Sequence, residues 1–338
     1  MNDPAIVREP RESYDLLGHE SEETAFLEAI KRGRIHHAWL LSGPRGVGKA
    51  TFAYRAARRL LGAKPDPAHG ALGASPDDPV CRRTESGAHG DLLVLSRPFD
   101  EKKNRYKGVI TVDEARKLTA WTSTTAGEGG WRVAIIDAAD DLNANAANAI
   151  LKTLEEPPTR TVVFLVSHSL GRLPTTVRSR CRRLTFRRTD EDTTKAAVRA
   201  VLGCSEAKAA EAAALAPGRP GEAVRLAAAG CGTLGASLSR LLDRLPNLDD
   251  AQAHALAEKV GGRDAEDLLG YFFDALGAHA LIRARSFDAE SWGEAWDRTR
   301  QLERDLDVLN LDPRAAALDA LAAMREAAAQ SSEAASAS

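Results

Sequence analysis

Short apolar runs alternate with stretches of helical periodicity over roughly the first 188 residues of the chain. Five of the runs have the length of strands, and they cover residues 39–42, 92–95, 132–137, 161–166 and a short stretch near 184–186. Helical segments lie between them, notably residues 51–61 and 143–156, and the second of these ends at Pro157-Pro158, which cannot continue a helix. This alternation predicts an α/β domain with a mainly parallel sheet.

The strand pattern stops at about residue 189, and alanine-rich amphipathic helices follow, with breaks at 216–221 and around 245–249. We therefore expect an α/β domain over 1–188 and two helical domains after it, a small one over 189–232 and a larger one over 233–326. Residues 61–90 are rich in Gly, Pro, Ala and Asp and predict a loop-rich insertion in the first domain. The Ser/Ala-rich segment 327–338 is expected to be a disordered tail.

Length and composition fit a globular protein of two or three domains. The N-terminus has no apolar segment typical of a signal peptide, and no apolar run approaches the roughly 20 residues that span a bilayer. We expect a cytoplasmic protein with no membrane partner. The net charge of -2 carries no nucleic-acid signature for the chain as a whole, so that any DNA contact has to come from a local patch or from other subunits.

A glycine-rich segment follows the first predicted strand and leads directly into a helix. Gly43, Gly46 and Gly48 precede Lys49 in the Gly-x4-Gly-Lys spacing of a P-loop, in which backbone N–H groups surround phosphate and the lysine reaches its outer oxygens. The motif then requires Ser or Thr to ligate Mg²⁺, but Ala50 stands there. Thr51 carries the hydroxyl one residue later, about 100° around the helix. The alternative is a strand-to-helix turn that binds nothing.

The predicted strand 132–137 ends in an acidic residue, Asp137. An apolar strand that ends in Asp, downstream of a P-loop, is the Walker B pattern, with the acid at the carboxyl end of a parallel strand beside the phosphate loop. The alternative, for the strand by itself, is an ordinary buried strand with a polar end.

Two further motifs indicate a family. Residues 148–158 read NAILKTLEEPP, and residues 173–182 read LPTTVRSRCR, with the predicted strand 161–166 between them. These segments resemble the AAA+ clamp-loader subunits of bacterial DNA polymerase III, and the delta-prime type most closely. The resemblance covers most of the chain, although the helical C-terminal third matches by architecture only. It implies a P-loop AAA+ domain with a mainly parallel five-stranded sheet, a small helical lid domain and an all-α C-terminal collar domain.

The resemblance assigns a role to Arg180. The triplet Ser179-Arg180-Cys181 matches the family motif whose arginine enters the ATP site of the adjacent subunit, where an arginine finger neutralises charge on the phosphates. The alternative is a surface arginine within a basic run.

Departures from the family pattern bear on hydrolysis. Family ATPases carry a catalytic Glu after the Walker B Asp and a nucleotide-sensing Arg in the lid, whereas this chain has Ala138 and Gly221. A methyl group cannot activate water. Together with Ala50, these losses predict that ATP is not hydrolysed and that ATP with Mg²⁺ binds weakly at most.

Family relatives often carry a four-cysteine zinc module in the insertion. In this chain the insertion offers only Cys81, His69 and His89, without short-spaced pairs, so that no zinc or other metal is expected.

The residues that we expect to form a degenerate nucleotide site are Gly43, Gly46, Gly48, Lys49, Thr51 and Asp137.

The resemblance thus implies a non-hydrolysing subunit of the polymerase III clamp loader, a noncatalytic part of a DNA polymerase holoenzyme. It would supply an arginine finger in trans and a rigid interface. Its implied partners are the motor ATPase subunits, the clamp-opening delta subunit, the sliding clamp and primed DNA. The main alternative is an active ATPase motor subunit of a clamp loader or a related DNA-remodelling AAA+ protein. A small-molecule P-loop kinase is a more distant alternative.

Overall fold

The computed structural model describes residues 9–100, 105–128, 130–262, 265–286, 288–309 and 311–337. The described chain divides into two compact units. The first, here called the α/β unit, contains the described residues up to 209 together with 216–222. The second, here called the helical unit, contains 210–215 and the described residues from 223 onward. The contacts therefore divide residues 189–232, predicted as a separate lid domain, between the two units.

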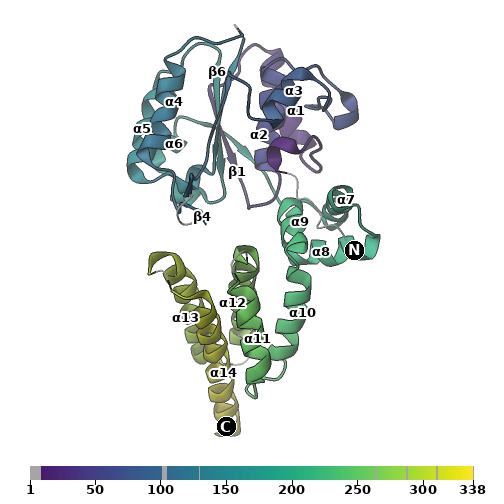
Figure 1. Ribbon diagram of the computed structural model, residues 1–338, viewed down its shortest axis with the longest axis vertical. Helices are drawn as coiled ribbons and strands as arrows, with labels where there is room; N and C mark the ends of the chain where they lie inside the picture. Colours follow the sequence, from purple (N-terminus) through teal and green to yellow (C-terminus); the bar gives the residue numbers. More distant parts are fainter. Residues whose placement is uncertain are drawn as a thin grey trace. The chain divides into compact units, whose positions relative to one another are not determined.

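A five-stranded sheet forms the centre of the α/β unit (Figure 1). Its strands are β1 (Ala38–Ser42), β2 (Leu92–Leu95), β5 (Arg132–Asp137), β6 (Thr161–Ser167) and β7 (Arg182–Thr185). They are ordered β2-β5-β6-β1-β7, and every neighbouring pair is parallel. This confirms the five predicted strands and their parallel arrangement.

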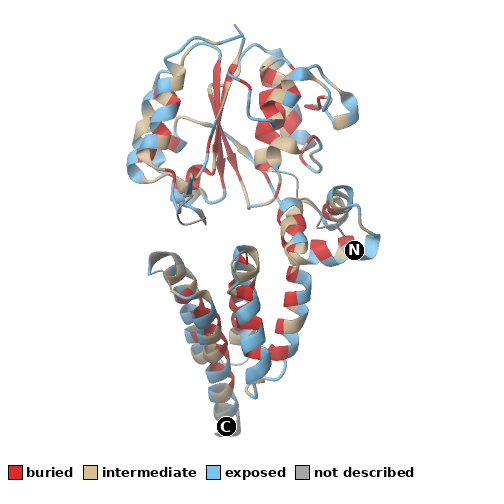
Figure 2. Cartoon of the chain, viewed as in Figure 1, coloured by how far each residue is buried: buried red, intermediate tan, exposed pale blue. Residues whose placement is uncertain are grey.

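Helices cover both faces of this sheet (Figure 1). Helices α1 (Glu20–Lys31) and α2 (Lys49–Leu60) pack on one face, and α4 (Val112–Thr122) and α5 (Ala144–Glu155) pack on the other. All residues of β1 and β6 are buried, as Figure 2 shows, because a parallel sheet covered on both sides has no solvated face. This burial on both faces explains why β1 and β6 appear in the sequence as near-continuous apolar runs.

The remaining elements of the α/β unit are short, apart from α7. They are η1 (Pro10–Glu12), η2 (Pro67–His69), α3 (Pro79–Glu85), the antiparallel pair β3 (Phe99–Asp100) and β4 (Arg105–Tyr106), η3 (Ala139–Asp141), η4 (Leu170–Arg172), α6 (Thr175–Arg178) and α7 (Glu191–Leu202). The insertion over 61–90 is mostly irregular, as predicted, apart from η2 and α3. Leu72 and Cys81 are nevertheless fully buried, so that the insertion packs against the rest of the unit.

The helical unit consists of antiparallel helices around an apolar core. Its main helices are α10 (Cys231–Leu242), α11 (Asp250–Val260), α12 (Glu266–Ser286), α13 (Ala289–Val308) and α14 (Pro313–Ala337). Helices α8 (Glu206–Leu215) and α9 (Pro220–Ala228) precede them, separated where the prolines and glycines of 216–221 predicted a break. Phe272, Phe273 and Trp292 are buried in the core. No helix among the described residues is both long enough and apolar enough to cross a membrane.

The prediction of a disordered tail over 327–338 is wrong for most of this segment, because α14 continues to Ala337. Ala327 and Ala328 are buried against the core of the helical unit. Alanine is the best helix former, and a buried face stabilises the helix further. The Ser/Ala composition was therefore compatible with a helix, and Ser338 lies outside the described residues.

A buried ion pair joins the first two helices of the α/β unit to the insertion. The guanidinium of Arg55 on α2 contacts the carboxylate of Glu23 on α1 at 2.7 Å, and the two side chains are 1% and 4% exposed. Arg55 also donates to the carbonyl of His69 at 2.6 Å, and the Glu23 carboxylate accepts from the backbone N–H of Leu72 at 3.3 Å. The pair therefore fixes the loop-rich insertion on the helical layer.

Substitution Glu23→Ala is expected to lower the free energy of unfolding of the α/β unit by about 3–5 kcal/mol, because it leaves the Arg55 charge buried without its partner. Urea denaturation of the full chain, followed by tryptophan fluorescence, measures the loss. The control is Glu28→Ala on the same helix, which breaks the exposed pair with Arg32 and should cost less than about 1 kcal/mol. Equal losses in the two variants would contradict the assigned role of the buried pair.

Candidate functional site

The glycine-rich loop follows β1 and ends where α2 begins at Lys49. Gly43, Gly46 and Gly48 have φ angles of +151°, +79° and +109°, a backbone conformation that other residues rarely adopt. The loop therefore has the geometry that its sequence predicted, with a strand before it and a helix after it.

The Lys49 side chain turns back onto this loop. Its ammonium donates to the carbonyl oxygens of Gly43 at 2.6 Å and Pro44 at 2.5 Å, and the residue is only 3% exposed. Burial lowers the pKa of Lys49 to about 8, although the carboxylates of Asp137 and Asp140 oppose this shift. The cation of the predicted phosphate site is thus held by the carbonyls of its own loop.

The position of the Walker B acid and the position that would ligate Mg²⁺ lie at the end of β5 and in the first turn of α2. Asp137 ends β5, and burial raises the pKa of its carboxyl, while the nearby Lys49 ammonium lowers it. The next residue, Ala138, is buried and has no group that can orient water. Ala50 is the second residue of α2 and packs with the core between the helices and the sheet, so that no hydroxyl stands there for Mg²⁺. Thr51 follows one helical position later.

Asp140 organises the end of the neighbouring strand β6. Its carboxylate accepts a hydrogen bond from the Ser167 hydroxyl at 2.8 Å and from the backbone N–H of Ser169 at 3.1 Å, and it also accepts from the N–H of His168. Ser167 is fully buried, and its hydroxyl is held by this bond to Asp140.

The first turn of α9 packs directly on the P-loop. The backbone N–H of Gly221 donates to the Gly46 carbonyl at 2.8 Å. A Cβ atom added at Gly46 would lie 2.4 Å from the Cβ of Glu222, so that only glycine fits at that position. The Glu222 carboxylate lies 3.8 Å from the Arg45 guanidinium.

The residues of this loop do not fit a magnesium nucleotide, the cofactor that the resemblance implies. Lys49 is bound to loop carbonyls, position 50 lacks the hydroxyl that would ligate the metal, and position 138 lacks the carboxylate that would orient water. Glu222 adds a negative charge beside the loop. A hollow of about 370 Å³ adjoins the loop, lined by Ser42, Gly43, Pro44, His168, Leu170, Arg183 and Thr185.

Arg180 lies in the turn between α6 and β7, at the amino end of β7, whereas the P-loop follows the carboxyl end of the parallel strand β1. Its guanidinium donates to the Thr176 carbonyl at 2.7 Å and pairs with the Glu155 carboxylate at 2.5 Å. The two paired side chains are 34% and 47% exposed, so that the pair remains open to solvent. Burial raises the pKa of the adjacent Cys181 thiol to about 12, which indicates a packing role for this cysteine.

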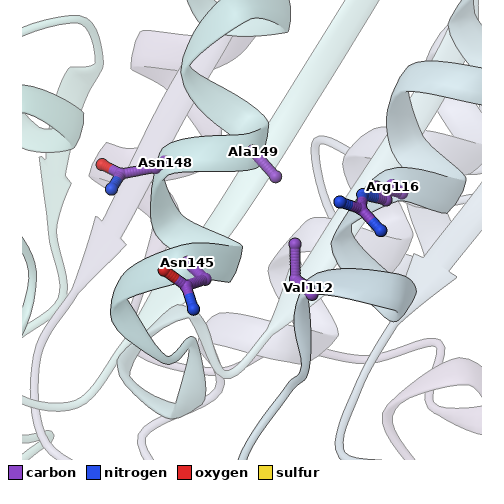
Figure 3. A pocket seen from close by; sticks show the side chains of 5 residues that line it. All are labelled: Val112, Arg116, Asn145, Asn148 and Ala149. Carbon is purple, nitrogen blue, oxygen red and sulfur yellow. The ribbon is translucent and has the colours of Figure 1, made fainter.

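A second hollow, of about 500 Å³, lies between α4 and α5 (Figure 3). It is lined by Val112, Arg116, Asn145, Asn148 and Ala149. None of the predicted site residues lines it.

The candidate zinc ligands of the insertion are dispersed. Cys81 is buried in α3, where burial raises the pKa of its thiol to about 11, and His69 binds the Asp15 carboxylate at 2.7 Å. Among the described residues, no group of three or more His, Cys, Asp and Glu side chains is placed to hold a metal ion.

Residues 18–190 match the family model described as DNA polymerase III, delta subunit, and this segment is about half of the chain. The chain belongs to this family. Among curated relatives, DNA polymerase III subunit delta' of Pseudomonas aeruginosa is 40% identical over 150 residues, which cover 44% of this chain and 43% of the relative. The subunit delta' of Escherichia coli is 35% identical over 154 residues, 46% of this chain and 43% of the relative.

A different subunit of the same polymerase is also similar. DNA polymerase III subunit gamma of Buchnera aphidicola is 32% identical over 186 residues, 54% of this chain and 47% of the relative. The matched segment spans less than half the length of each of these three relatives. The family assignment therefore rests on the α/β unit, and the activity of the whole protein is a matter for proposal.

The structure brings the P-loop residues and Asp137 together at one end of the sheet and places Arg180 apart from them. The structure also shows three acidic residues that the sequence analysis missed. Glu222 of α9 lies beside the P-loop, Glu155 of α5 pairs with Arg180, and Asp140 accepts from Ser167 at the end of β6. Glu155 belongs to the LEEPP segment, and this motif could have indicated it as a site residue. The place of Glu222 depends on how α9 packs, and no local pattern indicates it.

The lowered pKa of Lys49 predicts a specific pH dependence of stability. Between pH 8 and its ordinary value of 10.5, the unfolded chain holds a proton that the folded chain has released, so that stability rises with pH through this window. Relative to Lys49→Met, the wild type should gain up to about 3 kcal/mol of unfolding free energy as pH rises from 7 to 10. Denaturant titrations at several pH values measure this difference.

The control for this experiment is Lys31→Met, which removes an exposed lysine at the end of α1. It should leave the pH dependence of stability close to that of the wild type. If wild type and Lys49→Met change in parallel between pH 7 and 10, Lys49 does not have the depressed pKa that its burial implies.

Proposed function

We propose that this chain is a non-hydrolysing, delta-prime-type subunit of the DNA polymerase III clamp loader that completes a neighbouring ATP site with Arg180. Membership of the family and the relatives named delta' support the place in the polymerase. The role of Arg180 and the lack of hydrolysis rest on the geometry of the chain itself.

The observation that carries the proposal is the position of Arg180 relative to the P-loop. Strands β1 and β7 are parallel neighbours, with Trp39 beside Arg182 and Ser42 beside Thr185. The P-loop follows the carboxyl end of β1, whereas Arg180 precedes the amino end of β7. The paired strand segments alone separate them by about 10 Å. This separation from its own P-loop, together with the partial exposure of the Arg180 side chain, supports a role at a site on another subunit.

A motor ATPase subunit is the second candidate, and the similarity to subunit gamma favours it. A motor needs a ligand for Mg²⁺ and a carboxylate that orients the attacking water. Ala50 and Ala138 provide neither of these, and Gly221 stands where the resemblance places a sensing arginine. These three positions favour the non-hydrolysing subunit.

The partners follow from the proposed role. An arginine finger requires an adjacent motor ATPase subunit, and the family role adds the clamp-opening delta subunit, the sliding clamp and primed DNA. The chain would contribute a noncatalytic part of the polymerase holoenzyme.

The isolated chain is expected to turn over ATP no faster than background, because neither the metal ligand nor the catalytic carboxylate is present. Restoring the carboxylate with Ala138→Glu alone should not rescue turnover, since Ala50 still lacks a hydroxyl. A steady-state assay of released phosphate measures this. Hydrolysis that follows the purified protein and disappears in Lys49→Ala would show that the chain is a motor.

Arg180→Ala is expected to reduce the clamp- and DNA-stimulated ATPase of the reconstituted complex. An arginine finger contributes roughly 10³–10⁵ in rate at a single site, and the loss for the whole complex should be smaller because other sites keep their own fingers. Arg180→Lys should fail almost as strongly, since an ammonium cannot replace the planar fork. The substitution removes only a partly exposed ion pair, so that folding and assembly should change little.

Arg178→Ala is the matched control, because Arg178 is an exposed arginine two positions earlier whose guanidinium contacts only Thr175 of its own helix in the described contacts. Reconstituted complexes that contain Arg178→Ala should hydrolyse ATP at the rate of the wild-type complex. Complexes with Arg180→Ala that assemble and hydrolyse ATP as fast as the wild type, with clamp and primed DNA present, would rule out the finger.

A further inference from the structure

Charged side chains of both signs surround the P-loop. Lys49, Arg45 and Arg183 are the cations, while Asp137, Asp140 and Glu222 place three carboxylates among them. Phosphate loops bind anions through inward N–H groups, a helix N-terminus and a surplus of positive charge. Here the three carboxylates equal the three cations in number, so that the loop lacks a surplus of positive charge.

Glu222 is the only one of these carboxylates that comes from α9. The resemblance places a positively charged sensing residue at position 221, and this chain has a neutral glycine there, followed by an anion. The cation expected at position 221 is therefore absent, and Glu222 places a negative charge next to that position. The Arg45 guanidinium lies 3.8 Å from the Glu222 carboxylate, so that the charge of this cation is also partly neutralised.

The backbones of Gly221 and Gly46 are in close contact next to Glu222. The Gly221 N–H donates to the Gly46 carbonyl at 2.8 Å, and a Cβ atom added at Gly221 would lie 3.2 Å from the same oxygen. A Cβ added at Gly46 would overlap the backbone nitrogen of Glu222 at 2.5 Å. Two facing glycines therefore let α9 approach the loop, and this approach sets the Glu222 carboxylate beside it.

We propose that Glu222 excludes nucleoside triphosphate from the P-loop by holding a negative charge beside the loop, at the contact between Gly221 and Gly46. This inference does not depend on the arginine-finger role of Arg180. It adds a repulsive charge to the ligands that are missing at positions 50 and 138, and it identifies one residue whose change should strengthen the binding of nucleotide.

The test is a fluorescence titration of the full chain with an N-methylanthraniloyl derivative of ATP in the presence of Mg²⁺. Glu222→Gln keeps the shape of the side chain and removes its charge. It is expected to bind the probe at least about tenfold more tightly than the wild type, the order expected for one charge near a triphosphate at the protein surface. The gain should be larger for the ATP derivative than for the AMP derivative, because a charge effect grows with the number of phosphates.

Two further variants make the result specific. Glu206→Gln also neutralises a glutamate in the first turn of a helix, α8, that pairs with an arginine, Arg199, and it should bind the probe as weakly as the wild type. Adding Lys49→Ala to Glu222→Gln should abolish the gain, because the lysine is the cation of the loop. Thermal melting of each variant verifies that the fold is retained.

The proposal is overturned if Glu222→Gln and the wild type bind the ATP derivative equally, or if the gain survives Lys49→Ala. A gain in Glu222→Ala but not in Glu222→Gln also overturns it, since side-chain volume and not charge would then exclude the nucleotide. Failure of this test leaves the effect of Arg180→Ala on the complex unchanged, so that the two proposals fail separately.

Discussion

The parallel pairing of β1 with β6 on one side and β7 on the other determines where both candidate sites lie. Parallel strands give the sheet two chemically different ends. The loops after the strands meet at the carboxyl end, where the P-loop, Asp137 and the turn after Ser167 come together. The turn that carries Arg180 enters β7 from the amino end. The P-loop and Arg180 are therefore held at different ends of neighbouring strands.

The sequence predicted the parts of the fold whose physical cause is local or repetitive. Strands β1 and β6 are buried on both faces, so that they appear as continuous apolar runs, and α5 ends where Pro157 prevents its continuation. The pair β3 and β4 was missed because two-residue strands have no recognisable period. The end of α14 was wrongly predicted because burial of Ala327 depends on packing that composition does not contain.

The same distinction separates the site residues that were predicted from those that were missed. The glycines and Lys49 were found because a P-loop is a continuous segment with fixed spacing, and Asp137 because it ends a strand of the same sheet. The partners of these residues come from distant parts of the chain. Glu222 reaches the loop only because α9 packs on it, and Glu155 reaches Arg180 because α5 ends beside α6. Contacts of this kind follow from the tertiary structure alone.

The glycines and the lysine of the P-loop have a structural use that is independent of phosphate. Lys49 donates to two carbonyls of the loop, and the Gly46 carbonyl accepts from Gly221, so that these polar groups are satisfied within the protein. A residue with a Cβ atom at position 46 would overlap Glu222. The loop therefore joins β1 to α2 and also packs against Gly221 and Glu222. The fold itself therefore requires this conformation of the glycines and of Lys49, whether or not nucleotide is bound.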